Sequence, residues 1–222
     1  MTTVNKKKKK IRVPKILVIG GHDPTGGAGI QADIETIKSH NCHPVTLISC
    51  LTSQNTNKFK RSYPVDPRIF REQADLLLSD VSIDIIKIGA VGSAEILMEI
   101  MRLLKKINKP TVFDPIISPA MGGKLTSKGL LEEIKKKVFP FCYLITPNFN
   151  ELLTMTNSSK LILEDLKNLG TKYILVKDSE PKEKNIVNTL YFKSKFKKEW
   201  QVERVKKEFH GTGCTLAAAI AA

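Results

Sequence analysis

Short apolar runs and helical repeats alternate along most of the chain. The runs stop at glycine or at polar turn residues, and they predict buried strands at 16–19, 45–51, 84–88, 111–113, 143–145 and 173–176. Between the runs, apolar residues recur every three or four positions, which predicts helices at 27–39, 67–78, 93–107, 127–138 and 164–169. Strands that alternate with helices of this length build βαβ units, so the pattern predicts an α/β fold with a mostly parallel central sheet flanked by helices.

The C-terminal part of the chain departs from this alternation. Two β-rich segments at 186–192 and 196–202 predict a short antiparallel hairpin. After Gly213 the sequence runs Cys-Thr-Leu-Ala-Ala-Ala-Ile-Ala-Ala, which favours a helix without one charged residue. A helix that is apolar all round belongs inside a protein, so we expect this one to be buried and the sequence to be truncated, with its last C-terminal elements missing.

The chain is strongly basic, with 36 Lys and Arg against 22 Asp and Glu and a net charge of +14. Lys6–Lys10 lies in an N-terminal stretch without acids, and we expect residues 1–14 to be a disordered basic tail before one domain over residues 15–222. Such a charge suits nucleic acid or a polyphosphate substrate. No aromatic interleaving or nucleic-acid motif accompanies the basic runs, so we interpret them as solvated surface and expect no nucleic-acid partner.

The cysteines exclude several classes of protein. The chain has four, at Cys42, Cys50, Cys142 and Cys214. They are too sparse for a disulfide scaffold, and they show neither Cys-x-x-Cys nor zinc-ligand spacing. Because the cysteines form no disulfide pattern, we expect the protein to be in a reducing compartment. No apolar run approaches the ~18 residues of a membrane span, so we expect a cytoplasmic protein without a membrane partner.

Two glycine-rich loops carry the candidate chemistry. The first, Gly20–Gly29, follows the first predicted strand, and its glycines permit close backbone approach to a ligand. In the second, Gly211 and Gly213 begin the last helix and expose amide donors that form an anion site with the helix dipole. At that helix start we expect the thiol pKa of Cys214 to be lowered, so that the thiol works as a base or nucleophile. The alternatives are a plain tight turn for the first loop and an inert buried cysteine, while His210 is expected to be structural.

Six segments, taken together, resemble a known family. They are Gly21–Asp33 (Gly-His-Asp-Pro-Thr-Gly-Gly-Ala-Gly-Ile-Gln-Ala-Asp), Leu51–Thr56, Lys87–Gly89, Asp114–Pro115, Thr146–Asn148 with Glu151, and His210–Cys214. From about residue 15 to the end, the chain resembles the hydroxymethylpyrimidine/phosphomethylpyrimidine kinases of thiamin biosynthesis, a branch of the ribokinase superfamily. The resemblance implies a ribokinase-like three-layer sandwich and a homodimer. It also implies that ATP, with Mg²⁺, phosphorylates 4-amino-5-hydroxymethyl-2-methylpyrimidine and then its monophosphate.

The resemblance assigns roles at the substrate end of the site. Gln54 matches the glutamine that binds the aminopyrimidine, because an amide offers a donor beside an acceptor. Asp33 and Gly21 match residues near the pyrimidine and its hydroxymethyl group, although a carboxylate at Asp33 would equally suit the helix dipole. Cys214 matches the position of the proton-accepting base, and the amides of Gly211–Cys214 would hold the developing phosphate charge.

The resemblance also assigns the nucleotide end. Lys177, Asn148 and Thr212 match nucleotide-binding residues, and Asp114 and Glu151 match the acids around Mg²⁺, which needs few carboxylates because it keeps its waters.

Two positions depart from the family pattern. Ala120, within Pro119–Gly123, stands where the family has a flap lysine. Asp178-Ser179 stands where the family tends to have two glycines, and we expect its charge to crowd or repel a nucleotide phosphate.

Three alternatives stay open beside the leading interpretation. One is a pyridoxal or pyridoxine kinase of the same branch, whose substrate also carries a hydroxymethyl group on a nitrogen heteroaromatic ring. Another is a truncated, catalytically impaired member that only binds the pyrimidine. The last is a basic nucleic-acid-binding module, which would bind in a steeply salt-dependent manner.

Overall fold

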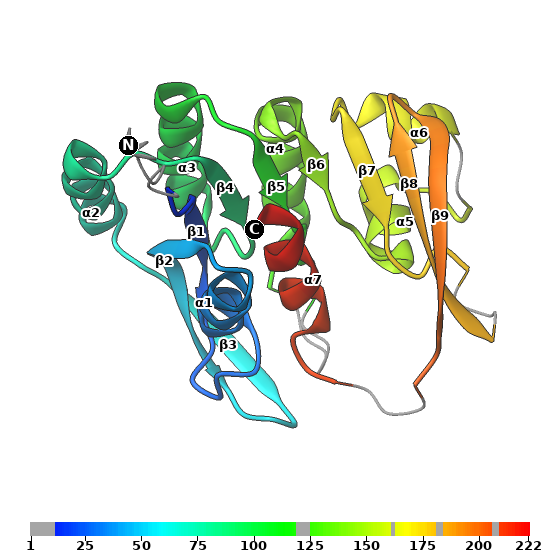
Figure 1. Cartoon of the computed structure of the whole chain (residues 1–222), viewed down its shortest axis with the longest axis horizontal. Helices are drawn as coiled ribbons and strands as arrows, with labels where there is room; N and C mark the ends of the chain where they lie inside the picture. The colour runs from blue at the N-terminus through cyan, green and yellow to red at the C-terminus, as the bar shows by residue number, and fades with distance from the viewer. Residues whose placement is uncertain (1–11, 119–124, 161–162, 181–183, 206–208) are drawn as a thin grey trace, which may run out of the picture.

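One sheet organises the computed structural model, which describes residues 12–118, 125–160, 163–180, 184–205 and 209–222 (Figure 1). Within these residues the sheet has nine strands in the order β3-β2-β1-β4-β5-β6-β7-β8-β9. Strands β2, β1, β4, β5, β6 and β7 are parallel neighbours, whereas β3, β8 and β9 pair antiparallel. The strand bounds are β1 Lys15–His22, β2 His43–Gln54, β3 Phe59–Pro64, β4 Ile85–Ile88, β5 Thr111–Phe113, β6 Leu144–Ile145, β7 Tyr173–Val176, β8 Asn185–Phe192 and β9 Lys195–Glu203.

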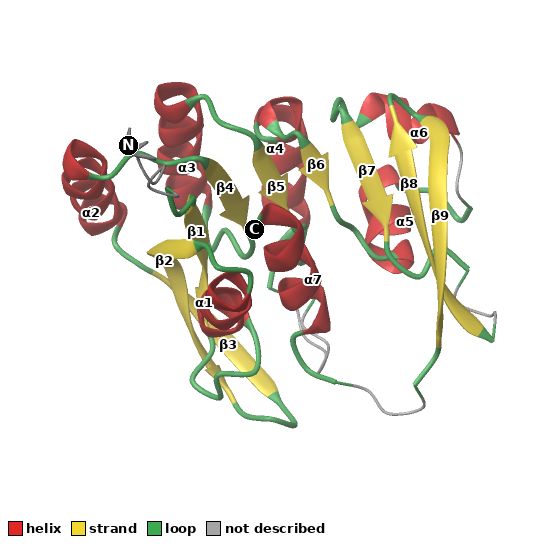
Figure 2. Cartoon of the chain, in the orientation of Figure 1, coloured by secondary structure: helices red, strands yellow, loops and turns green. Residues whose placement is uncertain are grey.

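Helices cover both faces of the sheet (Figure 2). One face carries α1 Gly29–Ser39 and α7 Thr212–Ala221. The other carries α2 Pro67–Asp80, α3 Ala94–Ile107, α4 Lys128–Lys137, α5 Phe149–Thr156 and α6 Leu163–Asn168, with a short 3-10 turn at Phe139–Phe141. The predicted α/β class, the mostly parallel sheet and the late antiparallel hairpin are therefore confirmed. Among the described residues, no helix has the length and apolar character needed to cross a bilayer.

The interior strand β1 shows why the apolar runs become strands. Its segment Ile16–Ile19 is fully buried, as expected of a strand covered on both faces. Leu17 and Ile19 join the core beneath α2–α6, whereas Ile16 and Val18 join the core beneath α1 and α7. Alternation of side chains across one strand thus supplies both hydrophobic cores.

Serine side chains fix the starts of two helices. Ser93 and Ser127 are N-caps, and their hydroxyl oxygens accept hydrogen bonds from the N–H groups of Ile96 and Leu130. Each bond satisfies a donor that the first helical turn leaves without an intrahelical partner.

Removing the α3 cap should have a small and specific effect. We expect Ser93→Ala to lower the free energy of unfolding by about 1 kcal/mol, because the N–H of Ile96 loses its acceptor. Urea denaturation measures this change. Ser93→Asp restores an acceptor and should keep wild-type stability. An equal loss in both variants would mean that Ser93 contributes by packing and not by capping.

Three features differ from the sequence-based expectations. Strand β3 and helix α5 were not predicted. The expected burial of the last helix on all sides is wrong for the described chain: Cys214, Ala217 and Ala221 are buried, but Ile220 is 38% exposed. Helix α7 packs through one face onto α1, β4 and β5, and its other face is not covered by described residues.

The residues predicted to form the basic tail, 1–14, lie outside the described part of the chain except for residues 12–14. Ala120 and its neighbours also lie outside the described residues.

Candidate active site

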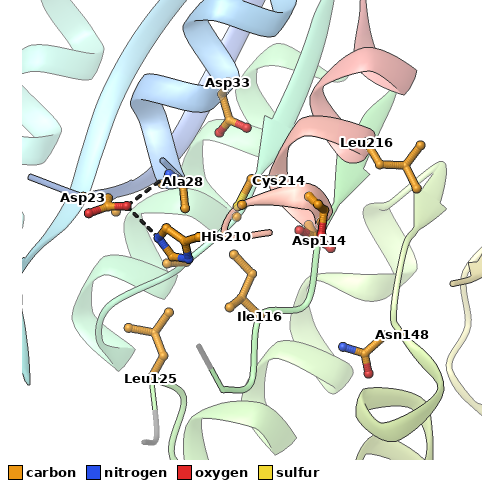
Figure 3. Close-up of a pocket in the computed structure, with 18 of the residues that line it drawn as sticks. Asp23, Ala28, Asp33, Asp114, Ile116, Leu125, Asn148, His210, Cys214 and Leu216 are labelled. Carbon is orange, nitrogen blue, oxygen red and sulfur yellow. Dashed lines mark hydrogen bonds and ion pairs between the residues drawn. The ribbon is translucent and has the colours of Figure 1, made fainter. Parts of the chain in front are cut away.

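A cavity of about 440 Å³ opens at the carboxyl ends of the parallel strands. Loops after β1, β4, β5, β6 and β7 line it, together with the end of β2 and the start of α7. Figure 3 shows side chains from several of these elements, including Asp23, Asp114, Asn148 and Cys214, around one space. This edge is where open α/β sheets bind ligands, because each strand delivers its following loop to the same place.

Asp23 organises the first glycine-rich loop. Its carboxylate accepts hydrogen bonds from the N–H groups of Thr25 (2.9 Å) and Ala28 (3.0 Å) and from the Thr25 hydroxyl (2.9 Å). The side chain is almost fully buried, so these donors replace the water that it loses. Asp23 is part of a motif noted in the sequence, but no role was predicted for it. Its place in an Asp-Pro-Thr turn, a pattern typical of local carboxylate–backbone bonds, was the available signal.

Asp23 also ties distant parts of the site together. Its Oδ2 lies 2.8 Å from Nε2 of His210, and the nearby Gln54 side chain helps to lower the pKa of the same carboxylate. In Figure 3, dashed lines join Asp23 to Ala28 and to His210. These three side chains come from the end of β2, the loop after β1 and the segment before α7. The contact gives His210 a partner within the protein, and His210 also lines the cavity.

Gly211 lets the two glycine-rich loops touch. Its φ is +84°, in the left-handed region that favours glycine. A Cβ at this position would overlap the carbonyl oxygen of Gly27, so the close approach itself requires glycine. Gly211, Thr212 and Gly213 all line the cavity at the start of α7. Their amides belong to the first helical turn, where N–H groups have no intrahelical acceptor, and together they suit an anion.

Asp33 and Lys87 form a buried ion pair at the floor of the cavity. Lys87 Nζ lies 2.8 Å from Oδ1 and 2.7 Å from Oδ2 of Asp33. The two side chains are 0% (Asp33) and 1% (Lys87) exposed. Although burial lowers the pKa of Lys87, the Asp33 carboxylate raises it above its ordinary value, so the lysine is charged. Asp33 lines the cavity as predicted, but both of its oxygens are bound to Lys87.

A second lysine–aspartate pair lies near Cys214. Lys177 Nζ lies 2.8 Å from Oδ1 of Asp114, and the Thr146 hydroxyl donates to the same oxygen at 2.9 Å. Burial raises the pKa of Asp114, but Lys177 and Lys87 outweigh this and hold the pKa below its usual value. Asp114 is therefore ionised. A Cβ on Gly213 would lie 3.1 Å from Lys177 Nζ, which places the ammonium group against the anion-binding loop.

The expectation of a lowered thiol pKa for Cys214 is wrong. Cys214 is only 7% exposed, and burial raises the pKa of its thiol. Lys87 acts in the opposite direction, but the charges of Asp114 and Asp33 reinforce the effect of burial. Loss of hydration thus outweighs the charge of Lys87, and the group is a neutral thiol at pH 7 in this structure.

Glu151 and Asn148 form a reciprocal capping box at the start of α5. The Asn148 N–H donates to Glu151 Oε2 at 2.9 Å, and the Glu151 N–H donates to Asn148 Oδ1 at 2.8 Å. Burial raises the pKa of Glu151 to about 7, with Lys177 opposing the rise and Asp114 adding to it. Both residues line the cavity, yet each also has a local structural task.

The cavity offers carboxylates of the kind that Mg²⁺ prefers. The described residues contain no group of three or more His, Cys, Asp or Glu that could enclose a metal. Asp114 and Glu151 nevertheless line the same cavity closely enough for their charges to interact. Two carboxylates with room for water and phosphate oxygens suit Mg²⁺, which keeps several waters when it binds. The residues therefore fit a magnesium ion that is brought in with phosphate.

Comparisons with known proteins agree with this geometry. A family model described as phosphomethylpyrimidine kinase matches residues 23–222. The putative hydroxymethylpyrimidine/phosphomethylpyrimidine kinase 2 of Schizosaccharomyces pombe is 29% identical over 239 residues, covering 96% of this chain and 43% of that protein. The chain spans only 40% to 44% of the length of the first curated relatives that it matches.

Solved structures give the same architecture. Phosphomethylpyrimidine kinase from Clostridium difficile is 30% identical and superposes with a TM-score of 0.77, covering 95% of this chain and 89% of that one. An ADP complex of Bacillus subtilis pyridoxal kinase superposes with a TM-score of 0.82 at 24% identity, covering 95% and 83%. The second likeness concerns the fold alone. Together they confirm the predicted ribokinase-like sandwich.

Proposed function

Because the chain belongs to the phosphomethylpyrimidine kinase family, we propose that it transfers phosphate from ATP to 4-amino-5-hydroxymethyl-2-methylpyrimidine and then to the resulting monophosphate, in thiamin biosynthesis. One observation carries the proposal: a single cavity contains an amide side chain, Gln54, together with the anion-binding start of α7 at Gly211–Cys214. A hydroxymethyl group on a ring bound near Gln54 would face the place where phosphate charge is stabilised.

The start of α7 supplies the electrostatic part of the mechanism. The amides of Gly211, Thr212 and Gly213 would bind the equatorial oxygens of the transferred phosphoryl group as charge develops on them. Lys177, whose ammonium lies against Gly213, adds positive charge at the same point. In its thiolate form, Cys214 would accept the proton of the attacking hydroxyl, and the charged Lys87 would favour that form over the neutral thiol.

At the substrate end, Gln54 would bind the amino group and ring nitrogen of the pyrimidine. Gly21 would allow the ring to approach the backbone, because it has no side chain there. Asp33 would act through Lys87, which it holds in place by two hydrogen bonds.

At the nucleotide end, Lys177, Asn148 and Thr212 would contact ATP. Asp114 and Glu151 would hold Mg²⁺ through bound water. When bound, the ion offsets the negative charge of the phosphates.

Loss of the Gln54 amide should weaken pyrimidine binding first. We expect Gln54→Leu to raise the dissociation constant of hydroxymethylpyrimidine about tenfold, because a bound amino group and ring nitrogen lose their partners. Isothermal titration calorimetry measures the affinity. Gln31→Leu makes the same substitution at an exposed position of α1 and should leave binding unchanged. Equal affinity of the Gln54 variant and the wild type would remove Gln54 from the site.

The activity itself is tested by ATP consumption of the 222-residue chain with hydroxymethylpyrimidine and Mg²⁺. Turnover with the pyrimidine supports the proposal. A parallel reaction with pyridoxal tests the neighbouring specificity, and turnover with pyridoxal alone would replace the proposed substrate. Saturable pyrimidine binding without turnover would mean that this chain binds the substrate but does not phosphorylate it.

A further inference from the structure

The end of β7 carries an unusual residue for its backbone conformation. Asp178 has φ +48°, in the left-handed region where most side chains are strained and aspartate is among the better tolerated. Its side chain lines the cavity directly after Lys177. A carboxylate here, beside the anion-binding loop, would repel nucleotide phosphates unless its charge were cancelled.

Arg204 cancels that charge. Nη1 of Arg204 donates to Asp178 Oδ2 at 2.9 Å, and Nη2 donates to Oδ1 at 2.6 Å, a two-pronged arrangement that fixes the carboxylate plane. Asn188 Oδ1 accepts the Asp178 N–H at 3.2 Å. The expected repulsion is therefore offset within the protein. Each carboxylate oxygen has two acceptor sites, so the pair with Arg204 leaves acceptor capacity on Asp178.

The neighbours of Asp178 in the cavity indicate which ligand group would donate hydrogen bonds to its remaining acceptor sites. Lys177, the preceding residue, lies against Gly213 at the phosphate-binding end. Asp178 itself contacts Asn188 of β8 and Arg204 just after β9. Ile186 and Val202, register partners on the same two strands, line the cavity with apolar side chains. Through these contacts Asp178 joins a phosphate-binding end to an apolar wall, which suits the phosphate, sugar and base of a nucleotide.

We propose that Asp178 selects the sugar of the phosphoryl donor by accepting hydrogen bonds from the ribose hydroxyls, while Arg204 removes the repulsion between its carboxylate and the phosphates. A carboxylate accepts hydrogen bonds but cannot donate them, so a hydroxyl group suits it and a phosphate does not. This inference rests on the proposed function and gives its nucleotide end a specificity for ribonucleotides.

The test compares ADP with 2′-deoxy-ADP and 3′-deoxy-ADP by isothermal titration calorimetry on the full chain. Wild type should bind ADP about tenfold more tightly than at least one deoxy form, because a hydrogen bond to a charged group is lost. In Asp178→Gly, which also relieves the left-handed strain, the ratio should fall below about twofold. Glu180→Gly removes an exposed acid from the same loop and should keep the wild-type ratio.

The outcomes separate this inference from the function on which it rests. The inference is overturned if Asp178→Gly weakens the binding of all three nucleotides equally, or if the wild type binds all three with the same affinity. In either case Asp178 does not recognise the ribose hydroxyls. In both cases nucleotide binding survives, so the proposed kinase function stands. Absence of binding of any nucleotide to wild type would overturn both.

The role of Arg204 has its own test. Arg204→Met leaves the Asp178 carboxylate unpaired, so it should weaken ADP about tenfold more than it weakens adenosine, which has no phosphate. Combining it with Asp178→Gly removes the unpaired charge and should return ADP affinity to within about twofold of Asp178→Gly alone. Equal weakening of ADP and adenosine by Arg204→Met would refute the charge-cancelling role.

Discussion

Replacing Cys214 by serine should lower kcat by about 10²-fold to 10³-fold and leave the affinity for hydroxymethylpyrimidine within about twofold of wild type. Serine has the same shape as cysteine and is slightly smaller, but its hydroxyl is a far weaker acid than the thiol and cannot supply a base at neutral pH. Steady-state kinetics give kcat, and calorimetry gives the affinity. Cys42→Ser is the matched control, because Cys42 is also buried but does not line the cavity.

The pH profile distinguishes a proton acceptor from a packing residue. Burial raises the pKa of the Cys214 thiol, so the thiolate fraction grows with pH across the neutral and mildly alkaline range. Wild-type kcat should therefore rise with pH in that range, whereas Cys214→Ser should lose this rise. A serine variant with wild-type kcat and the same pH profile would mean that Cys214 is a packing residue and that the amides at the start of α7 catalyse the reaction without it.

Local sequence signals predicted most of the fold because they depend on neighbours along the chain. The apolar run at 16–19 and the serines that cap α3 and α4 each act within a few residues. Helix α5 was missed for an instructive reason: Glu151 was considered only as a metal ligand, although Asn148 and Glu151 have the spacing of a capping box. Strand β3 is an edge strand with little burial, and it has no apolar run to reveal it.

Pairings across the fold could not be predicted from sequence. Asp33 and Lys87 are on α1 and β4, and their contact depends on the packing of α1 over the sheet. A lysine inside the apolar run Ile-Ile-Lys-Ile was a sign that it needs a buried partner, but not which one. The sign of the Cys214 pKa shift likewise depends on burial and on three charges from other elements. The residues predicted from the sequence therefore line the cavity, and the fold determines their protonation.

The Asp33–Lys87 pair gives the largest expected effect on stability. Lys87→Met fills a similar volume without charge, so it leaves the Asp33 carboxylate buried without a partner. Removing one partner of a buried ion pair typically costs about 3–5 kcal/mol, and we expect a loss of that size in the free energy of unfolding at pH 7. Urea denaturation measures it. Lys105→Met, at an exposed position of α3, is the control and should change stability by less than about 0.5 kcal/mol.

The double variant Lys87→Met/Asp33→Leu separates the stability of the pair from its use in the site. Removing both charges leaves no unpaired buried group, so stability should return to within about 1 kcal/mol of wild type. Activity should stay low, because Cys214 loses Lys87, whose lowering effect on the thiol pKa is larger than the raising effect of Asp33. A stable double variant with wild-type kcat would make the pair purely structural. A double variant as unstable as Lys87→Met alone would show that the charges themselves stabilise the fold, and that Asp33 and Lys87 are retained for folding before they serve catalysis.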